Sequence, residues 1–257
     1  MATFLKRGLL VVALPALLFA AWWFSSAGST NFFLPPLSKI MESFGALWLG
    51  PRFVTDILPS LGRLLLGYAI AVVAGVTLGT VLGLNARVRQ AAEPVLEFFR
   101  AIPPPALVPI FLLIIGIGDE TKLVVIATGA VWPILLNTVE GVRGYDSVLS
   151  DTSATFGIRG WRRLKEFILP GALPFIVAGM RTGLSIAIIL MVISEMFAPT
   201  TGLGASIILA QRSFAIPDMW SGVLVLGLIG FGLAMLFRLF ERRILSWYEG
   251  LKGLERR

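Results

Sequence analysis

Five apolar stretches, each of a length that can cross a lipid bilayer, dominate the chain. They cover about residues 61–84, 91–115, 122–139, 173–198 and 223–240. A bilayer core requires about 20 apolar residues in a helix, and a helix satisfies its own backbone groups within lipid. Charged residues make up 14% of the chain, against about 25% in soluble domains. The sequence therefore predicts an all-α, polytopic membrane helical bundle.

A further apolar block, residues 8–24, is open to two interpretations. The small residues at 25–27 are typical of a cleavage site, so the block could be a secretory signal peptide. The block is long for a signal core, however, and it ends in Trp-Trp-Phe, which is typical of the aromatic belt at a membrane interface. We favour an uncleaved N-terminal transmembrane helix over residues 1–27, which raises the expected number of transmembrane helices to about six.

The remaining segments complete the predicted domain organisation. Residues 28–59 are expected to form an extracytoplasmic segment, in which the amphipathic pattern at 37–48 predicts a short helix after a Pro-Pro pair. Residues 60–245 form the core domain, with a charged loop at 140–172, and residues 246–257 form a basic tail.

The distribution of Lys and Arg predicts the orientation in the membrane. Basic residues concentrate before residue 8, at 87–89, in the loop at 140–172 and after residue 237, whereas the alternate segments carry only Lys39, Arg52, Arg63, Lys122 and Arg212. Cytoplasmic loops carry the excess of basic residues. Both termini and the 140–172 loop are therefore expected in the cytoplasm.

Small residues recur every four positions in the stretch at 61–84. This spacing aligns them on one face of a helix, where a second helix can approach closely. Ordinary tight packing is the favoured interpretation, and a contact that slides during function is the alternative. The residues are Gly67, Ala71, Gly75, Gly79 and Gly83.

Prolines interrupt the stretch at 91–115. Pro103, Pro104, Pro105 and Pro109 each lack a backbone donor. Broken backbone at membrane depth is tolerated only where protein or water covers it. We therefore expect this stretch either near the cytoplasmic interface or beside a transport path.

Composition also excludes several classes of function. The chain contains no Cys and no His, which removes thiol catalysis, disulfides, histidine acid–base chemistry and most zinc or haem sites, so no metal site is expected. The net charge of +7 is explained by membrane topology, since no basic helix or aromatic-basic platform for nucleic acid is present.

The charged loop has a pattern of two short helices joined by a turn. Asp146 or Ser147 can cap the first helix and Gly157 can end it, while Gly160 opens the turn. The second helix is expected at 161–169, before Pro170 and Pro174 reset the chain. Such a unit suits docking into a groove on a soluble protein. The alternative is a solvated loop held near anionic lipid by its arginines.

The same loop resembles the EAA loop of permease subunits of bacterial ATP-binding-cassette importers. Gly157 and Leu169-Pro170 stand in register with the motif, while Asp151-Thr152-Ser153 stands where Glu-Ala-Ala is usual. The residues that the resemblance assigns to ATPase coupling are Asp151, Ala154, Gly157, Arg159, Gly160, Trp161, Arg162, Arg163, Leu169 and Pro170.

Other motifs resemble one branch of that family, the permeases for nitrate, sulfonate, taurine and bicarbonate. They include Phe99-Arg100-Ala101-Ile102-Pro103-Pro104, Gly116-Ile117-Gly118-Asp119, Gly179-Met180-Arg181-Thr182-Gly183, Ser194-Glu195-Met196 and Gly202-Leu203-Gly204. The resemblance covers about residues 30–245 and implies a type I importer permease fold in the bacterial cytoplasmic (inner) membrane.

The resemblance also implies partners. Two cytoplasmic ATPase subunits would dock on residues 145–168, a second permease copy or paralogue would complete the path, and an extracytoplasmic binding protein would deliver the solute. The chain contains no Walker-type glycine loop. It is therefore not expected to be an enzyme or to bind a cofactor, and ATP and Mg²⁺ would belong to the partner ATPase.

Two ionisable residues, Arg181 and Glu195, stand within the stretch at 173–198. Charges inside a bilayer are costly and usually face a bundle interior or a water-filled path. They are fourteen residues apart, or about 21 Å along a helix, too far to pair with each other. Arg181 could attract an anion and Glu195 could gate the outer mouth, although pairing with other helices is favoured. The candidates for the translocation path are Arg100, Asn137, Thr138, Arg181, Ser185, Ser194 and Glu195.

An anion such as a sulfonate, nitrate or related organic acid is the expected solute, and a thiamine-type pyrimidine or other heterocycle is the alternative.

Three other classes of function have less support in the sequence. An ion-coupled secondary transporter requires internal repeats, and none is evident. A membrane enzyme requires clustered acids, His or Cys. A structural scaffold is opposed only by the family motifs.

Overall fold

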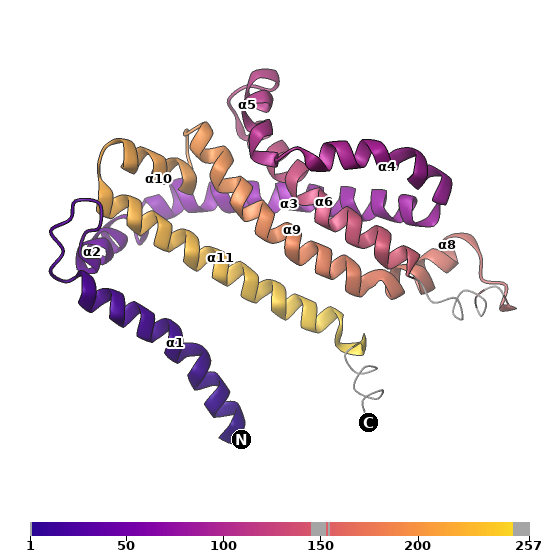
Figure 1. Ribbon diagram of the computed structural model, residues 1–257, viewed down its shortest axis with the longest axis horizontal. Coiled ribbons are helices and arrows are strands. Elements are labelled where there is room, and N and C mark those ends of the chain that lie inside the picture. The colour runs from indigo at the N-terminus through magenta and orange to yellow at the C-terminus, as the bar shows by residue number, and fades with distance from the viewer. Residues whose placement is uncertain (1, 145–152, 154, 249–257) are drawn as a thin grey trace.

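The computed structural model describes residues 2–144, 153 and 155–248, and it is helical over almost all of them (Figure 1). The predicted all-α bundle is confirmed. The longer helices are α1 (Ala2–Ser26), α2 (Leu37–Trp48), α3 (Leu58–Leu84), α4 (Ala86–Ala101), α5 (Pro104–Ile114), α6 (Asp119–Arg143), α9 (Leu169–Phe197), α10 (Leu203–Arg212) and α11 (Ile216–Ile244). Shorter turns are η1 (Phe53–Ile57), α8 (Gly160–Arg163) and η2 (Leu164–Ile168).

Four helical segments of the described residues are long and apolar enough to cross a membrane. They are Phe53–Leu84, Asp119–Arg143, Gly160–Phe197 and Ile216–Ile244, and the bent pair of α4 and α5 makes up to 5. Residues Ala13–Ser26 of α1 form a shorter apolar helix. The expected number of about six is reached only when the bent pair and α1 are each counted as a span.

Helix α6 is the centre of the bundle, with α3 on one side and α9 on the other. The small-residue stripe of α3 lies against α6. A Cβ atom added at Gly79 would stand 2.6 Å from the Thr138 Cβ, and one at Gly75 would stand 2.8 Å from the Ile134 Cγ2. Such distances leave no space for a side chain, so the glycines set the separation of the two helices.

The proline-rich stretch at 91–115 is two helices instead of one straight span. Helix α4 ends at Ala101, Pro103 is extended at φ −61° and ψ 122°, and α5 starts at Pro104 after a bend of 90°. Proline disfavours the helical conformation of the residue before it, which explains the break. Helix α4 has no buried residue, and the tip of α5 projects from the bundle (Figure 1).

The sequence pattern predicts that the helix before Pro170 ends there and that α9 begins as a separate helix. The structure differs from this prediction. The short helix α8 continues through the π-helical turn η2 into α9, forming one segment of 38 residues, Gly160–Phe197. The same arrangement precedes α3, where η1 is followed by Pro59 at the second helical position. A proline ring clashes with the carbonyl four residues earlier. The wider π turn removes that clash and lets both helices continue.

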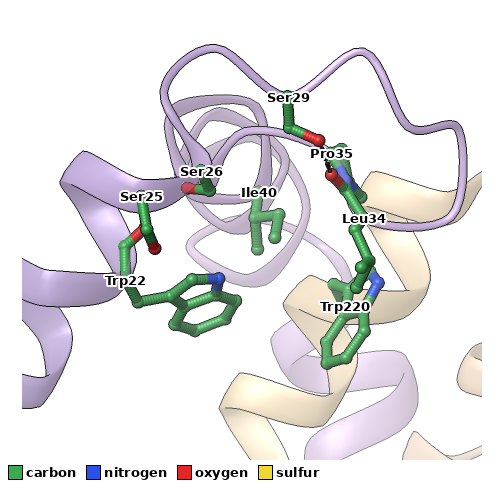
Figure 2. Close-up of a pocket in the computed structure, with 8 residues that line it drawn as sticks. All are labelled: Trp22, Ser25, Ser26, Ser29, Leu34, Pro35, Ile40 and Trp220. Carbon is green, nitrogen blue, oxygen red and sulfur yellow. Dashed lines mark hydrogen bonds between the residues drawn. The ribbon is translucent and has the colours of Figure 1, made fainter.

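Helices α1 and α11 meet near α2 and then diverge (Figure 1). At the meeting point the Ser26 Oγ accepts a hydrogen bond from the Leu37 backbone N–H at 3.1 Å. The rings of Trp22 and Trp220 lie 6.2 Å apart and face a cavity of about 210 Å³ (Figure 2). Helix α2 begins and ends where the sequence predicts its short amphipathic helix, and it packs on α11.

Candidate functional site

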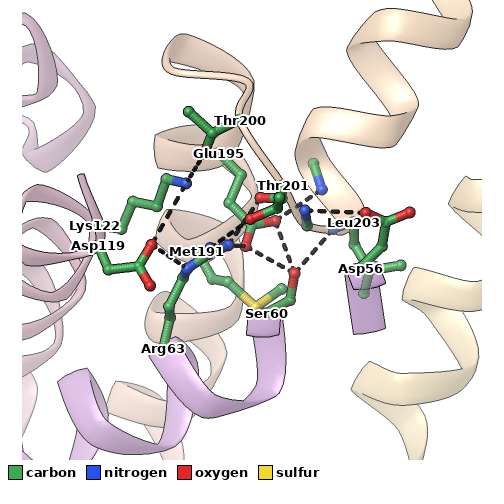
Figure 3. Close-up of polar contacts among 12 residues, drawn as sticks. Asp56, Ser60, Arg63, Asp119, Lys122, Met191, Glu195, Thr200, Thr201 and Leu203 are labelled. Atoms are coloured by element: carbon green, nitrogen blue, oxygen red, sulfur yellow. Dashed lines mark hydrogen bonds and ion pairs between the residues drawn. The ribbon is translucent and has the colours of Figure 1, made fainter. Parts of the chain in front are cut away.

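A buried polar network joins the start of α3, the start of α6 and the end of α9 (Figure 3). Its centre is the Arg63 guanidinium, which donates at 2.8 Å to both the Asp119 and the Glu195 carboxylates. The same guanidinium donates to the Thr201 carbonyl at 2.8 Å and to the Thr201 hydroxyl at 2.7 Å. Arg63 and Glu195 are buried, so this network fixes the relative positions of three helices.

The network also caps helix α10. The backbone N–H groups of Leu203 and Gly204 donate at 2.9 Å to the Ser60 hydroxyl and the Glu195 carboxylate. Gly202 donates to the Asp56 carboxylate at 3.3 Å. The first N–H groups of a helix lack partners within the helix, and side chains of other helices supply them here. Gly202 has a φ of +119°, which favours glycine.

Lys122 extends the network across α6. Its side chain is 1% exposed, and its ammonium donates to the Thr200 hydroxyl at 2.9 Å and lies 3.9 Å from the Asp119 carboxylate. In the predicted topology Arg63 and Lys122 count among the basic residues of the alternate segments, although each also stands at the start of a predicted apolar stretch. Both lie within candidate membrane spans and are buried. The position of both residues at the start of an apolar stretch was the sequence signal that could have indicated their burial.

Several candidates for the translocation path lie in the interior of the bundle. Glu195 belongs to the network, and the Ser194 hydroxyl donates to the Met191 carbonyl at 2.9 Å. Thr138 and Asn137 donate to carbonyls one turn earlier on α6, at 2.7 and 2.8 Å. Ser194, Thr138 and Asn137 thus form hydrogen bonds within their own helices, and Thr138 also lies at the contact of α6 with α3.

Helix α9 presents a polar patch on its exposed face. Arg181, Thr182 and Ser185 lie near the middle of the helix and are exposed, whereas Phe175 and Ile189 on the same face are apolar. The Arg181 guanidinium forms an ion pair with the Glu241 carboxylate of α11, with 57% of the Arg181 side chain and 19% of the Glu241 side chain exposed. Arg181 and Ser185 are therefore the two predicted path residues that the structure brings together on an open surface.

The turn of the predicted coupling segment is exposed. Gly157 and Gly160 have φ values of +70° and +57°, and Trp161 is 72% exposed. The Arg162 guanidinium donates to the Glu166 carboxylate at 3.1 Å. Asp151 and Ala154 lie outside the described residues, as do Asp146 and Ser147. Arg159 is exposed and Arg163 is half-buried, while Leu169 and Pro170 begin α9.

The remaining path candidate, Arg100, forms an ion pair with Glu97 on α4, with a separation of 2.5 Å.

A family model decides the class of protein. Residues 71–246 match the family described as "Binding-protein-dependent transport system inner membrane component". The chain belongs to this family. The match includes α6, the predicted coupling segment, α9 and α11. The chain is thus a membrane-spanning permease subunit of an ATP-binding-cassette importer, with a transport role instead of a catalytic one.

Individual proteins agree with this assignment. The chain is 29% identical to a putative aliphatic sulfonates transport permease protein of Bacillus subtilis, over 96% of this chain and 89% of that protein. It is 30% identical to the taurine transport system permease protein of Escherichia coli (91% and 87% covered). It is also 30% identical to the bicarbonate transport system permease protein of Synechococcus elongatus (86% and 84% covered).

A solved structure supports the same fold. The MetNI methionine transporter in an inward-facing conformation aligns with a TM-score of 0.64 at 20% identity, covering 75% of this chain and 96% of that chain. The predicted type I importer permease fold is therefore confirmed.

Proposed function

We propose that the chain moves a small anionic solute across the bacterial cytoplasmic membrane along the polar face of α9. The observation that carries this proposal is the exposed group of Arg181, Thr182 and Ser185 on an otherwise apolar span. Such residues inside a membrane avoid lipid and face a partner or a water-filled path. An arginine on that path attracts anions.

The names of the relatives support the class of solute. Permeases for aliphatic sulfonates, taurine and bicarbonate are among them, and each of these solutes carries an acidic group. A sulfonate, nitrate or related organic acid therefore fits best. A thiamine-type pyrimidine or other heterocycle is the second candidate solute. In such a solute, no group is evident that the Arg181 guanidinium would bind.

Energy would come from a separate ATPase. Two cytoplasmic ATPase subunits would dock on residues 145–168, where Trp161 is exposed, and would bind the ATP and Mg²⁺. The segment Gly160–Phe197 is one continuous helix. A displacement of Trp161 would therefore reach Arg181 in the middle and Glu195 at the far end without a hinge between them, which suits the alternation between two packings of the bundle.

Two further partners complete the proposed assembly. A second permease, identical or paralogous, would cover the polar face of α9 and the exposed apolar end of α5, where Leu113 is 87% and Ile114 is 75% exposed. An extracytoplasmic binding protein, as the family description implies, would deliver the solute. The excess of basic residues beside the coupling segment supports an orientation with both termini in the cytoplasm.

Uptake into proteoliposomes tests the proposal. The permease is reconstituted with its ATPase and binding protein, and entry of labelled sulfonates and nitrate is measured with and without ATP. We expect uptake only when the ATPase and ATP are both present. We also expect Arg181→Gln to reduce uptake by about tenfold or more, since it removes the charge–charge contact between the guanidinium and the anionic solute. Arg87→Gln, which removes an exposed charge on α4, is the matched control and should transport normally. Uptake by the permease alone would instead indicate an ion-coupled secondary transporter.

A further inference from the structure

A cavity and a groove follow one another between α1 and α11. The cavity of about 210 Å³ is lined by Trp22 and Trp220, where the two helices meet (Figure 2). The groove, of about 420 Å³, begins one turn away on both helices, at Phe19 and Val223, and reaches Leu228. We propose that they bind one phospholipid with a primary ammonium headgroup, a phosphatidylethanolamine, with the headgroup in the cavity and an acyl chain in the groove.

Tryptophan side chains mark the level of the cavity in the membrane. Trp22 and Trp23 stand in the last turns of α1, and Trp220 stands in the second turn of α11. Tryptophan is enriched at the membrane–water interface, where its ring lies at the level of the lipid headgroups. Both helices run from this level into their apolar stretches, so the groove lies at the depth of the acyl chains. With the termini in the cytoplasm, as proposed above, the site belongs to the outer leaflet.

The polar groups of the cavity favour a cation. The hydroxyls of Ser25, Ser26 and Ser29 each donate to a backbone carbonyl, at 3.2, 3.5 and 2.6 Å. The Trp220 indole N–H donates to the Phe33 carbonyl at 3.0 Å. These donors are therefore in use, whereas a hydroxyl oxygen keeps lone pairs as acceptors. None of the eight described residues that line the cavity is charged, so an anion would find no counter-charge there.

The number of remaining acceptors matches a primary ammonium group. The Ser26 oxygen already accepts from the Leu37 backbone N–H, and the Ser29 oxygen from the Asn31 N–H. Each of these two oxygens keeps one lone pair, and the Ser25 oxygen keeps two. An ammonium group has three donors and no acceptor. A quaternary ammonium has no N–H donor, so it would leave these acceptors without partners.

The two indole rings add a second attraction for the same cation. The ring centroids of Trp22 and Trp220 are 6.2 Å apart, and the ring planes meet at 64°. A cation in the angle between them can lie within about 6 Å of both centroids, which is the range of a cation–π contact. Within the described part of the chain, the Trp22 indole N–H has no hydrogen-bond partner. It is available to donate to a phosphate oxygen of the same lipid.

The groove explains why the ammonium belongs to a lipid and not to a free amine. Its lining comes from α1, α2 and α11 and contains no charged side chain, with Phe19, Met41 and Leu228 among its residues. From Trp220 to Leu228 the distance along α11 is about 12 Å, so one molecule must carry a cation and a long apolar chain. Helix α11 is also the least buried of the candidate spans, with 11% of its most apolar stretch buried. A phospholipid fulfils both requirements, and a flexible acyl chain can fill the space between two diverging helices.

Lipid binding to the purified transporter tests the inference. The permease is purified with its ATPase, its lipids are removed in detergent, and native mass spectrometry counts the lipids that bind as their concentration is raised. Phosphatidylethanolamine, phosphatidylcholine and phosphatidylglycerol with identical acyl chains are compared. We expect the dissociation constant to be about tenfold lower for phosphatidylethanolamine than for either other lipid. Water-soluble phosphoethanolamine at the same concentration should not displace it.

Variants separate the contributions of the cavity. Ser25→Ala removes an acceptor at an exposed position, and we expect it to lower the preference for phosphatidylethanolamine over phosphatidylcholine by about fivefold. Trp220→Leu removes a cation–π contact and should lower the preference over phosphatidylglycerol by a similar factor. Trp247→Leu, at an exposed tryptophan beyond the other end of α11, is the matched control and should change neither preference.

A second pair of variants examines the groove. Gly227 lines it, and both Gly227 and Gly232 of α11 have open space where a side chain would begin. Gly227→Leu fills the groove, so it should weaken binding of all three lipids alike and leave the preferences unchanged. Gly232→Leu is its control and should bind as the wild type does.

Two results would overturn the inference. Equal binding of the three headgroups, or tighter binding of phosphatidylglycerol, would mean that the cavity does not select an ammonium group and would leave the groove to nonspecific lipid or to a second permease. Displacement by phosphoethanolamine, or wild-type binding by Gly227→Leu, would mean that the groove holds no acyl chain. Because the measurement requires no transport, neither result bears on the ATP-driven role proposed above.

Discussion

Arg63 and Glu195 form a buried ion pair between the start of α3 and the end of α9, with a separation of 2.8 Å between the guanidinium and the carboxylate. The pair lies at the end of the bundle opposite to the coupling segment, which connects the end of α6 to the start of α9. Because Glu195 also accepts from Ser60 and from the α10 backbone, it holds the far end of the long helix in place.

Glu195→Gln should destabilise the folded protein. The amide keeps the shape of the side chain, but Arg63 loses a buried counter-charge, and only Asp119 still neutralises it. The expected loss is about 2–3 kcal/mol, which lowers the melting temperature by about 4–12 °C for a chain of this size. Thermal unfolding of the purified permease in detergent measures the effect.

Glu97→Gln is the control, since its ion pair with Arg100 is half exposed and exposed pairs contribute about 0–1 kcal/mol. Equal melting temperatures for the two variants would mean that the buried network does not hold the helices together.

Gly79→Ala should also destabilise the bundle, although alanine is the better helix former. The added methyl would stand 2.6 Å from the Thr138 Cβ and 2.8 Å from the Leu135 carbonyl oxygen, so α3 and α6 must separate. Overpacking of this kind costs about 1–3 kcal/mol, seen as a lower melting temperature.

Gly232→Ala on α11 makes the same change where nothing lies within 4 Å of the new Cβ. It should stabilise the helix by about 0.5–1 kcal/mol. If Gly79→Ala behaved like Gly232→Ala, the contact between α3 and α6 would be looser than the structure indicates.

Gly157→Val should uncouple ATP hydrolysis from transport. Gly157 has a φ of +70° and open space around its Cα, so backbone conformation alone restricts the substitution. A β-branched residue avoids positive φ, whereas asparagine tolerates it. We therefore expect Gly157→Asn to retain coupled uptake, and Gly157→Val to hydrolyse ATP with uptake reduced about tenfold or more, a loss of at least about 1.4 kcal/mol. Parallel assays of phosphate release and solute uptake measure the coupling. Normal uptake by the valine variant would show that coupling does not require the turn at Gly157.

Local sequence patterns predicted the structural elements that depend only on nearby residues. Apolar length identified the candidate spans, and the four-residue spacing from Gly67 to Gly83 identified the face of α3 that meets α6. Prolines at 103–105 indicated a break, but the angle of 90° depends on packing against α6 and α9. The continuous helix through Pro170 was missed, because a π turn that accommodates a proline has no evident local signature.

The partners of the charged residues lie far away in sequence, and this explains the errors at the site. Glu195 and Arg181 were recognised as costly within a membrane, yet Arg63 and Glu241 become their partners only when α3, α9 and α11 pack together. Lys122 stands at the start of a predicted apolar stretch, and its partner Thr200 lies far away in sequence. Burial at a helix end is a property of the assembled bundle.

We propose that a cytoplasmic ATPase drives this chain through the segment that precedes α9. The chain has no cysteine, so Trp161→Cys places a single thiol on that segment at an exposed position. The most direct test is labelling of this thiol with a membrane-impermeant maleimide in inside-out and right-side-out vesicles, with and without the bound ATPase. We expect labelling only in inside-out vesicles, and protection when the ATPase is bound. Labelling from the outer side, or equal labelling with and without the ATPase, would contradict it.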